Sequence, residues 1–261
     1  MLQKERYEQI YNILQERNGA TVQYLKKRLY VSEATIRRDL EAMEANGLLK
    51  RVWGGAMPQT RKDKDFPMFV RNQENIDKKE KIAKTASRLL QNSSVILVDN
   101  STTCMHLVPY IAKHKSISVV TFGLHIQQML TEQTEATVHL LGGEVYEKRF
   151  MAGHVALTSL QHYHGDIFLF SCSGISEEFG ITSREARYVE ICRAMLKRSK
   201  HNVLLCDTSK VGKNHMWTTA SLDEIDYVIM DDTPKDNGLI NTLGKKLITD
   251  PAQLPNSLMS V

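Results

Sequence analysis

Apolar residues near the start of the chain recur at helical spacing. Val22, Leu25 and Leu29 follow one another at three- and four-residue intervals and therefore predict a helix with one buried stripe. Thr21 stands directly before this stripe, where its hydroxyl can accept a backbone N–H of the first turn. The pattern predicts a short amphipathic helix that begins just after Thr21.

A second helix is predicted after a turn at Tyr30–Val31. Ser32 is placed to cap it, and Asn46–Gly47 tolerates the left-handed backbone that a helix end requires. The predicted buried face consists of Ile36, Leu40 and Met43. Leu48–Trp53 then predicts a short strand that runs into a Gly54–Gly55 turn. Two helices around a tight turn, followed by a hairpin, are the layout of a winged helix-turn-helix, which docks on duplex DNA.

The balance of charge supports a nucleic-acid partner for this segment. Residues 1–64 hold 13 Lys and Arg against 8 Asp and Glu, whereas residues 65–261 hold 21 against 22. The basic excess of the chain therefore lies wholly in its first quarter, where it favours phosphate contacts and a steep salt dependence.

Polar side chains of the second helix and of the hairpin are the candidate DNA contacts. An isolated Arg-Arg pair usually marks a solvated helix face, but a pair early in the second helix of a helix-turn-helix can reach a major groove. In the hairpin, Lys50 and Arg51 are favoured as phosphate contacts over Trp53, which could instead pack the hairpin onto the domain. The predicted DNA-binding residues are Ser32, Thr35, Arg37, Arg38, Lys50 and Arg51.

The stretch from Arg6 to Ala56 resembles the amino-terminal signature of the DeoR family of bacterial transcriptional regulators. The resemblance is carried by the motif Ser-x-x-Thr-hydrophobic-Arg-Arg-Asp-Leu at residues 32–40 and by Arg51–Ala56. The motif is long, so a chance match is improbable. The resemblance implies a DNA-binding regulator, and we expect a repressor of a carbohydrate-related operon.

From about Ile76 onward the pattern changes to helical segments that alternate with short apolar runs. Such alternation predicts a largely parallel sheet covered by helices, which is an α/β fold. The predicted helices are Lys81–Leu90, Cys104–Lys113, Leu124–Thr131 and Arg184–Ser199. The predicted strands are Val95–Val98, Ser118–Val120, Val138–Leu141, Ile167–Phe170, Val203–Cys206 and Tyr227–Met230.

Small, hydroxylated or charged residues follow five of these runs. Ligands of parallel sheets bind outside the carboxyl ends of the strands, and N–H groups at a helix start attract anions. A phosphorylated small molecule would suit such a site, with Lys210 pairing the anion. The predicted effector-binding residues are Asp99, Ser101, Thr102, Thr103, Gly142, Gly143, Ser173, Gly174 and Lys210.

The same segment also resembles the DeoR-type sensor domain, with matching motifs in the same order along the chain. These motifs are Asp99–Thr103, Val119–Thr121, Gly142-Gly143, Gly174-Ile175, Gly180–Thr182 and Asp207–Lys210. The resemblance implies a Rossmann-like fold similar to ribose-5-phosphate isomerase, and an effector that is a phosphorylated sugar or related metabolite.

The chain departs from the family pattern at four positions of this domain. Ser101 replaces a glycine, Phe122 stands in place of an amide, Tyr188 replaces a glutamate and Cys192 replaces a lysine. Three alternatives therefore remain: a regulator without a small-molecule effector, an isomerase-like enzyme that uses Asp99 or Asp207 as its base, and a metal sensor. For the metal sensor only His162-x-His164 offers closely spaced histidines, and no zinc-type spacing is present.

The predicted organisation is a winged helix-turn-helix at residues 1–56, a polar linker at 57–75, and an α/β domain for effector sensing and oligomerisation at 76–261. No signal peptide or run of eighteen apolar residues is seen, and the four cysteines are expected to be reduced and buried, so we expect a cytoplasmic protein. The expected partners are double-stranded operator DNA, a phosphorylated effector and further copies of the chain. No cofactor, metal or catalytic residue is predicted.

Overall fold

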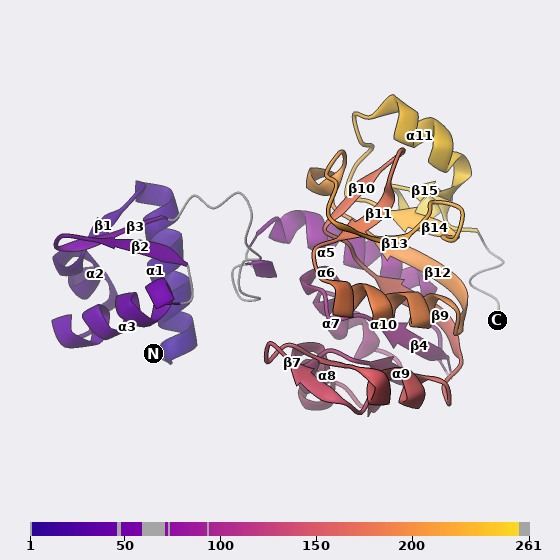
Figure 1. Cartoon of the computed structure of the whole chain (residues 1–261), viewed down its shortest axis with the longest axis horizontal. Coiled ribbons are helices and arrows are strands. Elements are labelled where there is room, and N and C mark those ends of the chain that lie inside the picture. Colours follow the sequence, from indigo (N-terminus) through magenta and orange to yellow (C-terminus); the bar gives the residue numbers. More distant parts are fainter. Residues whose placement is uncertain (1, 46–47, 59–70, 73, 93, 256–261) are drawn as a thin grey trace. The chain divides into compact units, whose positions relative to one another are not determined.

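The computed structural model describes residues 2–45, 48–58, 71–72, 74–92 and 94–255 (Figure 1). The chain divides into two compact units, Met1–Glu74 and Asn75–Val261. Within the described residues, no helix is both long enough and apolar enough to span a membrane.

Between residues 2 and 58, the described part of the first unit combines α-helices with a small antiparallel sheet. Its strands lie in the order β1-β3-β2. In chain order the elements are α1 (Gln3–Arg17), β1 (Ala20–Thr21), α2 (Val22–Leu29), α3 (Glu33–Ala45), β2 (Leu49–Val52) and β3 (Gly55–Pro58). The predicted helix pair and hairpin are confirmed. β3 continues through Pro58, two residues beyond the expected end of the domain at Ala56, because Leu49 pairs with Pro58.

The predicted caps set the boundaries of α2 and α3. The hydroxyl of Thr21 accepts a hydrogen bond from the Tyr24 N–H at 3.1 Å, and that of Ser32 accepts one from the Thr35 N–H at 3.1 Å. Tyr30 takes the left-handed conformation, with φ of 55°, in the turn between the two helices. The predicted inward stripes are buried: Val22, Leu25, Leu29, Ile36, Leu40 and Met43. The predicted helix stop at Asn46–Gly47 lies outside the described residues.

The second unit is built on a seven-stranded sheet in which every neighbouring pair is parallel, as the sequence predicts. The strand order is β15-β14-β12-β9-β4-β5-β6. The strands are β4 (Val95–Val98), β5 (Ser118–Thr121), β6 (Thr137–Leu140), β9 (Gly165–Phe170), β12 (Ser199–Leu205), β14 (Tyr227–Ile229) and β15 (Leu247–Ile248).

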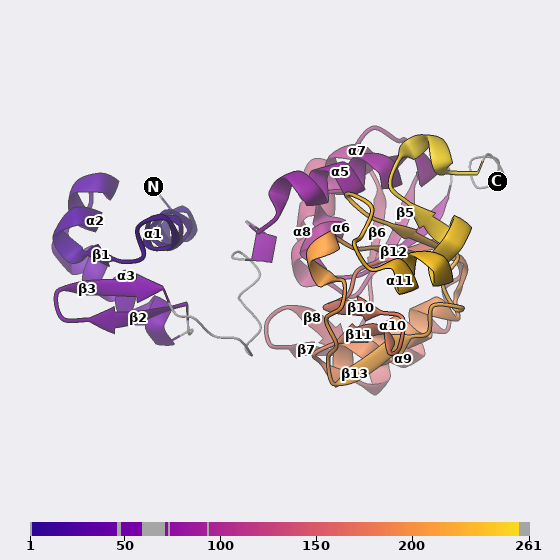
Figure 2. The same cartoon turned by 90° about the horizontal axis from the view of Figure 1, so that it is seen from above.

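Helices cover both faces of this sheet (Figure 2). One layer holds α5 (Ile76–Ala86), α6 (Thr102–Met105), α7 (Val108–Ile111) and α8 (Leu124–Gln133). The other holds α9 (His154–Leu160) and α10 (Ala186–Leu196), and α11 (Asn237–Leu243) precedes β15. Since both faces are covered, Leu97 and its neighbours Ile96 and Val98 are all fully buried. Burial on both faces is why these strands read as continuous apolar runs rather than as alternating patterns.

Two small antiparallel pieces were not predicted. β10 (Gly174–Ser176), β11 (Gly180–Ser183) and β13 (Trp217–Ala220) form a three-stranded sheet in the order β10-β11-β13. β7 (Glu144–Tyr146) and β8 (Phe150–Ala152) form a hairpin. All of these segments except β8 mix apolar residues with polar residues or glycine, so they lack the continuous apolar runs of the main sheet, and at three or four residues they are too short for a periodic signal.

The predicted helix over Cys104–Lys113 is wrong in one respect, since α6 and α7 are separate. Pro109 lies in the first turn of α7 and has no N–H to donate to the carbonyl of Met105. The chain therefore breaks at His106–Leu107 and starts a new helix. The helix predicted at Lys81–Leu90 begins earlier, at Ile76, and Ser199 belongs to β12 rather than to α10.

Candidate functional site

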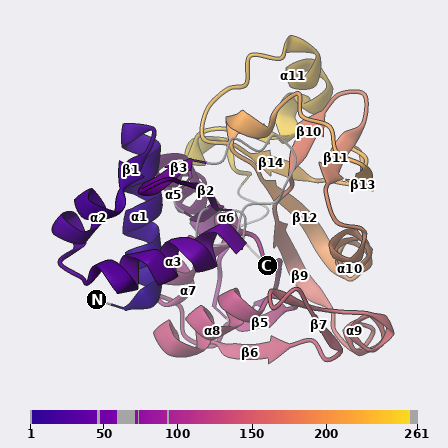
Figure 3. The ribbon, with the colours of Figure 1, turned by 60° about the vertical axis from the view of Figure 1, so that its left-hand side comes forward.

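Three of the predicted DNA-binding residues, Thr35, Arg37 and Arg38, belong to α3, which is labelled in Figure 3. Arg37 and Arg38 are exposed, whereas Ile36 on the opposite face is fully buried. The guanidinium of Arg37 donates to Glu33 from Nη2 at 2.7 Å and from Nε at 3.0 Å. This hydrogen bond lowers the pKa of Glu33. Arg37 is thus held along the helix.

Ser32 and Thr35 lie at the start of the same helix. Their hydroxyl oxygens are 2.8 Å apart, and the Ser32 oxygen also caps the helix. These two hydroxyls therefore fix the start of α3.

The β2–β3 hairpin presents a second group of exposed residues. Lys50 and Arg51 are exposed on β2, and the Arg51 N–H donates to Glu44 of α3 at 2.7 Å, which ties the hairpin to the helix. Trp53 lies at the hairpin tip, and its side chain is fully exposed. The interpretation that Trp53 packs the hairpin onto the domain is therefore wrong. Trp53 was not among the predicted DNA-binding residues.

In the second unit, the ends of β4 and β9 meet at Asp99, and Ser171 links them to the end of β12 by donating its hydroxyl to the Leu205 carbonyl. The strands β12, β9 and β4 are adjacent and parallel, so the residues that follow them share one edge of the sheet. The carboxylate of Asp99 accepts the N–H of Ser101 at 2.9 Å, the N–H of Ser171 at 2.8 Å and the hydroxyl of Tyr188 at 2.6 Å. Asp99 is fully buried. Burial, followed by the charge of Asp99, raises the pKa of Tyr188 well above its usual value, so this phenol is neutral.

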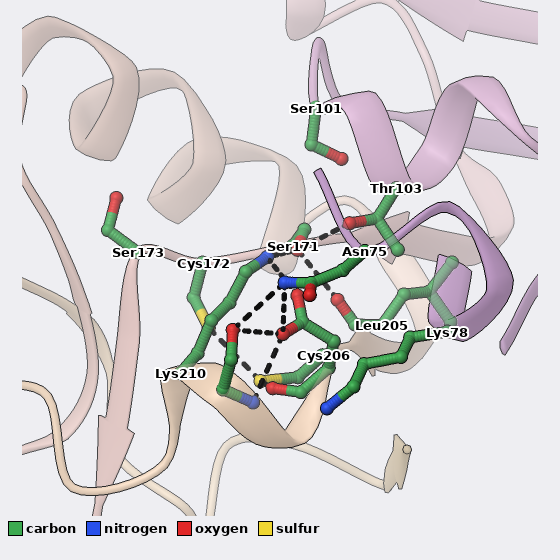
Figure 4. Close-up of polar contacts among 12 residues, drawn as sticks. Asn75, Lys78, Ser101, Thr103, Ser171, Cys172, Ser173, Leu205, Cys206 and Lys210 are labelled. Atoms are coloured by element: carbon green, nitrogen blue, oxygen red, sulfur yellow. Dashed lines mark hydrogen bonds and ion pairs between the residues drawn. The ribbon is translucent and has the colours of Figure 1, made fainter. Parts of the chain in front are cut away.

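Lys210 is the cation of this strand-end cluster (Figure 4). Its ammonium donates to the Ser171 hydroxyl at 2.9 Å and lies 3.6 Å from the Asp207 carboxylate. Burial by itself lowers the pKa of Lys210. The nearby Cys172, Cys206, Asp207 and Asp99 raise it by more, so the pKa of Lys210 lies above its usual value. Lys210 therefore carries its charge in a largely buried place.

The beginning of the second unit also contributes to this edge. The Asn75 amide donates to Ser209 at 3.2 Å and to Asp207 at 3.4 Å. The Lys78 ammonium donates to the Thr208 hydroxyl at 2.7 Å. Asn75 was assigned to the linker and Lys78 was not singled out, because neither carries a local motif.

The hydroxyl residues after β4 lie on α6 at the same edge. Ser101 caps α6, since its hydroxyl accepts the Cys104 N–H at 3.2 Å. Thr102 and Thr103 are buried, and the Thr103 oxygen lies 3.4 Å from that of Ser171. Thr103 is therefore connected to Lys210 through Ser171, whereas Ser101 lies apart from these contacts in Figure 4.

The remaining predicted residues have structural surroundings of their own. A Cβ added to Gly143 would lie 2.6 Å from the Ala152 carbonyl oxygen, and one added to Gly174 would lie 2.0 Å from that of Lys213. Both glycines therefore permit close backbone approach. Gly142 is exposed beside Val155. The Ser173 N–H donates to the Thr182 carbonyl at 3.0 Å at the start of the small sheet. No contact of these four residues with Lys210 is recorded among the described residues.

Two family models match the chain. The DeoR-like helix-turn-helix domain matches residues 6–62, and the DeoR C terminal sensor domain matches residues 74–232. The chain belongs to the DeoR family of transcriptional regulators. The resemblance read from the sequence is therefore confirmed.

Curated relatives of this DeoR-family chain align with it over most of their length. The HTH-type transcriptional regulator GolR of Listeria innocua is 32% identical over 87% of this chain and 90% of its own. The HTH-type transcriptional repressor GlcR of Bacillus subtilis is 32% identical over 90% of each chain. The glycerol-3-phosphate regulon repressor of Escherichia coli is 27% identical over 90% of this chain and 93% of its own.

Solved structures align with the DeoR-family chain over a smaller part. Ribose 5-phosphate isomerase A from Methanocaldococcus jannaschii aligns with a TM-score of 0.41 and 15% identity, over 53% of this chain and 55% of its own. Among the described residues of this chain, no group of three or more His, Cys, Asp or Glu is arranged to hold a metal ion.

Proposed function

We propose that this DeoR-family regulator binds duplex operator DNA through α3 and the β2–β3 hairpin and represses carbohydrate-related genes. The observation that carries the proposal is the exposed pair Arg37–Arg38 on a helix whose other face is buried, with Lys50 and Arg51 on the attached hairpin. Guanidinium groups match the acceptors of guanine in the major groove, and lysines match phosphates. Trp53 extends the same surface at the hairpin tip.

Repression and a carbohydrate-related target are proposed by analogy with relatives. GlcR is named a repressor, and the Escherichia coli relative is named a glycerol-3-phosphate regulon repressor. A protein that binds a bacterial operator acts in the cytoplasm. In a symmetric oligomer, two helix-turn-helix domains related by symmetry would suit a pseudo-palindromic DNA site.

The proposed effector is a phosphorylated sugar or related metabolite bound at the Lys210 edge of the sheet. Lys210 is a charged, largely buried ammonium, and Lys78 brings a second cation to the neighbouring Thr208. An anion that replaces the protein partners of Lys210 would gain a charge-assisted hydrogen bond in a place of low dielectric constant. Ser101 and Thr103 supply hydroxyls at the same edge.

The carboxylates at this edge support a regulator rather than an isomerase. An isomerase needs a carboxylate free to take a proton from its substrate. Asp99 already accepts three hydrogen bonds, and Asp207 accepts the N–H of Ser209 at 3.1 Å and lies beside Lys210. Both are committed to holding the loops.

The test is retention of the full chain on a duplex DNA column at low ionic strength. Arg38→Ala and Arg37→Ala should each elute at lower salt because each removes a cation from the proposed interface. Lys50→Ala, which removes a proposed phosphate contact, should reduce the slope of log affinity against log salt by about 0.9. Arg88→Ala is the matched control, because Arg88 is an exposed arginine of the second unit. Unchanged elution of both α3 variants would remove α3 from the proposed interface.

A further inference from the structure

Two cysteines lie side by side at the Lys210 edge of the sheet. Cys172 follows β9 and Cys206 follows β12, and their sulfur atoms are 3.7 Å apart (Figure 4). The last paired residues of the two strands are Phe170 and Leu204, and each cysteine lies two positions further along. The pair therefore continues the register of two neighbouring parallel strands.

This spacing suits a disulfide without rearrangement of the backbone. Neighbouring strands lie about 4.8 Å apart, and disulfides join Cα atoms that are about 4.4–6.8 Å apart. The two thiols already contact each other through sulfur, so closing the bond requires the sulfurs to approach rather than the strands to move. Both cysteines are free in the structure.

The surroundings make the two thiols unequal. The hydrogen bond with Cys206 lowers the pKa of Cys172, burial opposes this, and the charge of Lys210 lowers it further, for a net fall. The pKa of Cys206 is raised well above its usual value by the hydrogen bond with Cys172 and by burial. Cys172 retains 8% exposure, whereas Cys206 has none. Because Cys172 is the less completely buried of the two and has the lowered pKa, we expect a small oxidant to react there first, with Cys206 placed to resolve the product.

We propose that Cys172 and Cys206 form a reversible oxidation site that hydrogen peroxide converts to an intramolecular disulfide. The Cys172 thiolate attacks one peroxide oxygen, the O–O bond breaks, and the departing hydroxide takes up the proton that Cys172 released, giving water and a sulfenic acid. The Cys206 sulfur then attacks the Cys172 sulfur, the S–O bond breaks, and hydroxide leaves with the Cys206 proton as a second water. The two thiols lose two electrons and two protons, and one peroxide is reduced to two waters.

The disulfide would link the two loops that hold Lys210. Cys172 follows Ser171, which accepts the hydrogen bond from Lys210, and Cys206 precedes Asp207, which lies 3.6 Å from the same ammonium. Oxidation would therefore act directly on the surroundings of the cation that we propose as the effector contact.

The other two cysteines are internal controls. Burial raises the pKa of both Cys104 and Cys192 well above its usual value. Cys104 donates to the Leu169 carbonyl at 3.5 Å, and both side chains are fully buried. Neither combines residual exposure with a lowered pKa, as Cys172 does.

The experiment treats the full-length, folded protein with hydrogen peroxide, blocks remaining thiols with an alkylating reagent under denaturing conditions, and maps the cysteine peptides by mass spectrometry. The wild-type protein should yield a cross-linked peptide pair containing Cys172 and Cys206, lighter by two hydrogens, which dithiothreitol reverses. Cys104→Ser and Cys192→Ser should form the same pair. Cys172→Ser and Cys206→Ser should not.

The wild-type peptide map needs no variant, so a serine variant that folds poorly does not affect the conclusion. The proposal is overturned if Cys172 and Cys206 are both fully alkylated after peroxide treatment, or if the cross-link joins other cysteines. This outcome is independent of DNA binding and effector binding, and it leaves the proposed function untouched.

Discussion

Arg6 of α1 and Asp39 of α3 form a buried, bidentate ion pair. The Arg6 guanidinium donates to Asp39 Oδ1 from Nη2 at 3.0 Å, and to Oδ2 from Nε. The side chain of Asp39 is fully buried, and that of Arg6 is 11% exposed. Asp39 directly follows Arg37 and Arg38, so this pair fixes the rotation of α3 that turns the two arginines outward.

Asp39→Asn should destabilise the first unit strongly, because it leaves the Arg6 guanidinium buried without its counter-charge. Removing one partner of a buried pair costs about 3–5 kcal/mol. Urea unfolding, monitored through hydrogen exchange of the α3 amides, measures the loss in the free energy of unfolding. The double variant Arg6→Met/Asp39→Leu removes both charges and should recover much of the stability. A single variant as stable as the wild type would show that the pair does not orient α3.

Trp53 should contact DNA at the tip of the hairpin. The chain has two tryptophans, so Trp217→Phe leaves Trp53 as the sole indole reporter. Adding an A·T-rich duplex at low salt should quench or shift its emission, as apolar side chains of DNA-binding proteins insert between base steps. Trp53→Ala should lower affinity roughly five-fold, about 1 kcal/mol, whereas Trp53→Phe keeps a ring. Phe179→Ala, another exposed aromatic residue, is the control. An emission spectrum indifferent to DNA would remove Trp53 from the interface.

Lys210 should determine the response to phosphorylated sugars. A ligand at 100 times its dissociation constant adds about 2.7 kcal/mol to stability, so a thermal-shift screen of sugar phosphates should find one that raises the melting temperature. Lys210→Ala should abolish that shift. Lys197→Ala, at the exposed lysine that directly follows α10, should preserve it. A shift that survives in Lys210→Ala would place the anion elsewhere.

His106, between α6 and α7, should make the second unit less stable in mild acid. Burial, and then the charge of Lys79, lowers the pKa of His106, and within the described residues its buried Nε2 atom has no hydrogen-bond partner. The unfolded chain therefore binds a proton at His106 more tightly than the folded chain does. As the pH falls below about 6.5, the free energy of unfolding decreases.

The measurement is urea unfolding between about pH 7 and pH 5, the range in which an unperturbed histidine titrates. In a Trp53→Phe background, the fluorescence of Trp217 reports the second unit. His106→Gln should flatten the dependence on pH, and His162→Gln, at an exposed histidine, should not. Equal slopes in the wild type and in His106→Gln would contradict the assignment.

Local chemistry was enough to predict α2, α3 and the hairpin of the first unit. The caps at Thr21 and Ser32 and the buried stripes depend on residues within a few positions of one another, and the structure has both helices where that chemistry places them. The exposure of Trp53 did not follow, because whether a hairpin tip finds a neighbour is a property of the folded domain. Apolar runs likewise predicted the parallel sheet, but not the short strands β7 and β10.

The sequence by itself determined the family, the helix-turn-helix, every described strand of the main sheet except β15, and Lys210 as the cation that follows a strand. Only the tertiary structure decided which strand ends meet. The order β12-β9-β4 brings Asp207, Ser171 and Asp99 together, leaves Gly142 apart, and sets Cys172 beside Cys206. The physical reason is that periodicity and capping act over one or two turns of chain, whereas strand order follows from packing the whole sheet between its helices.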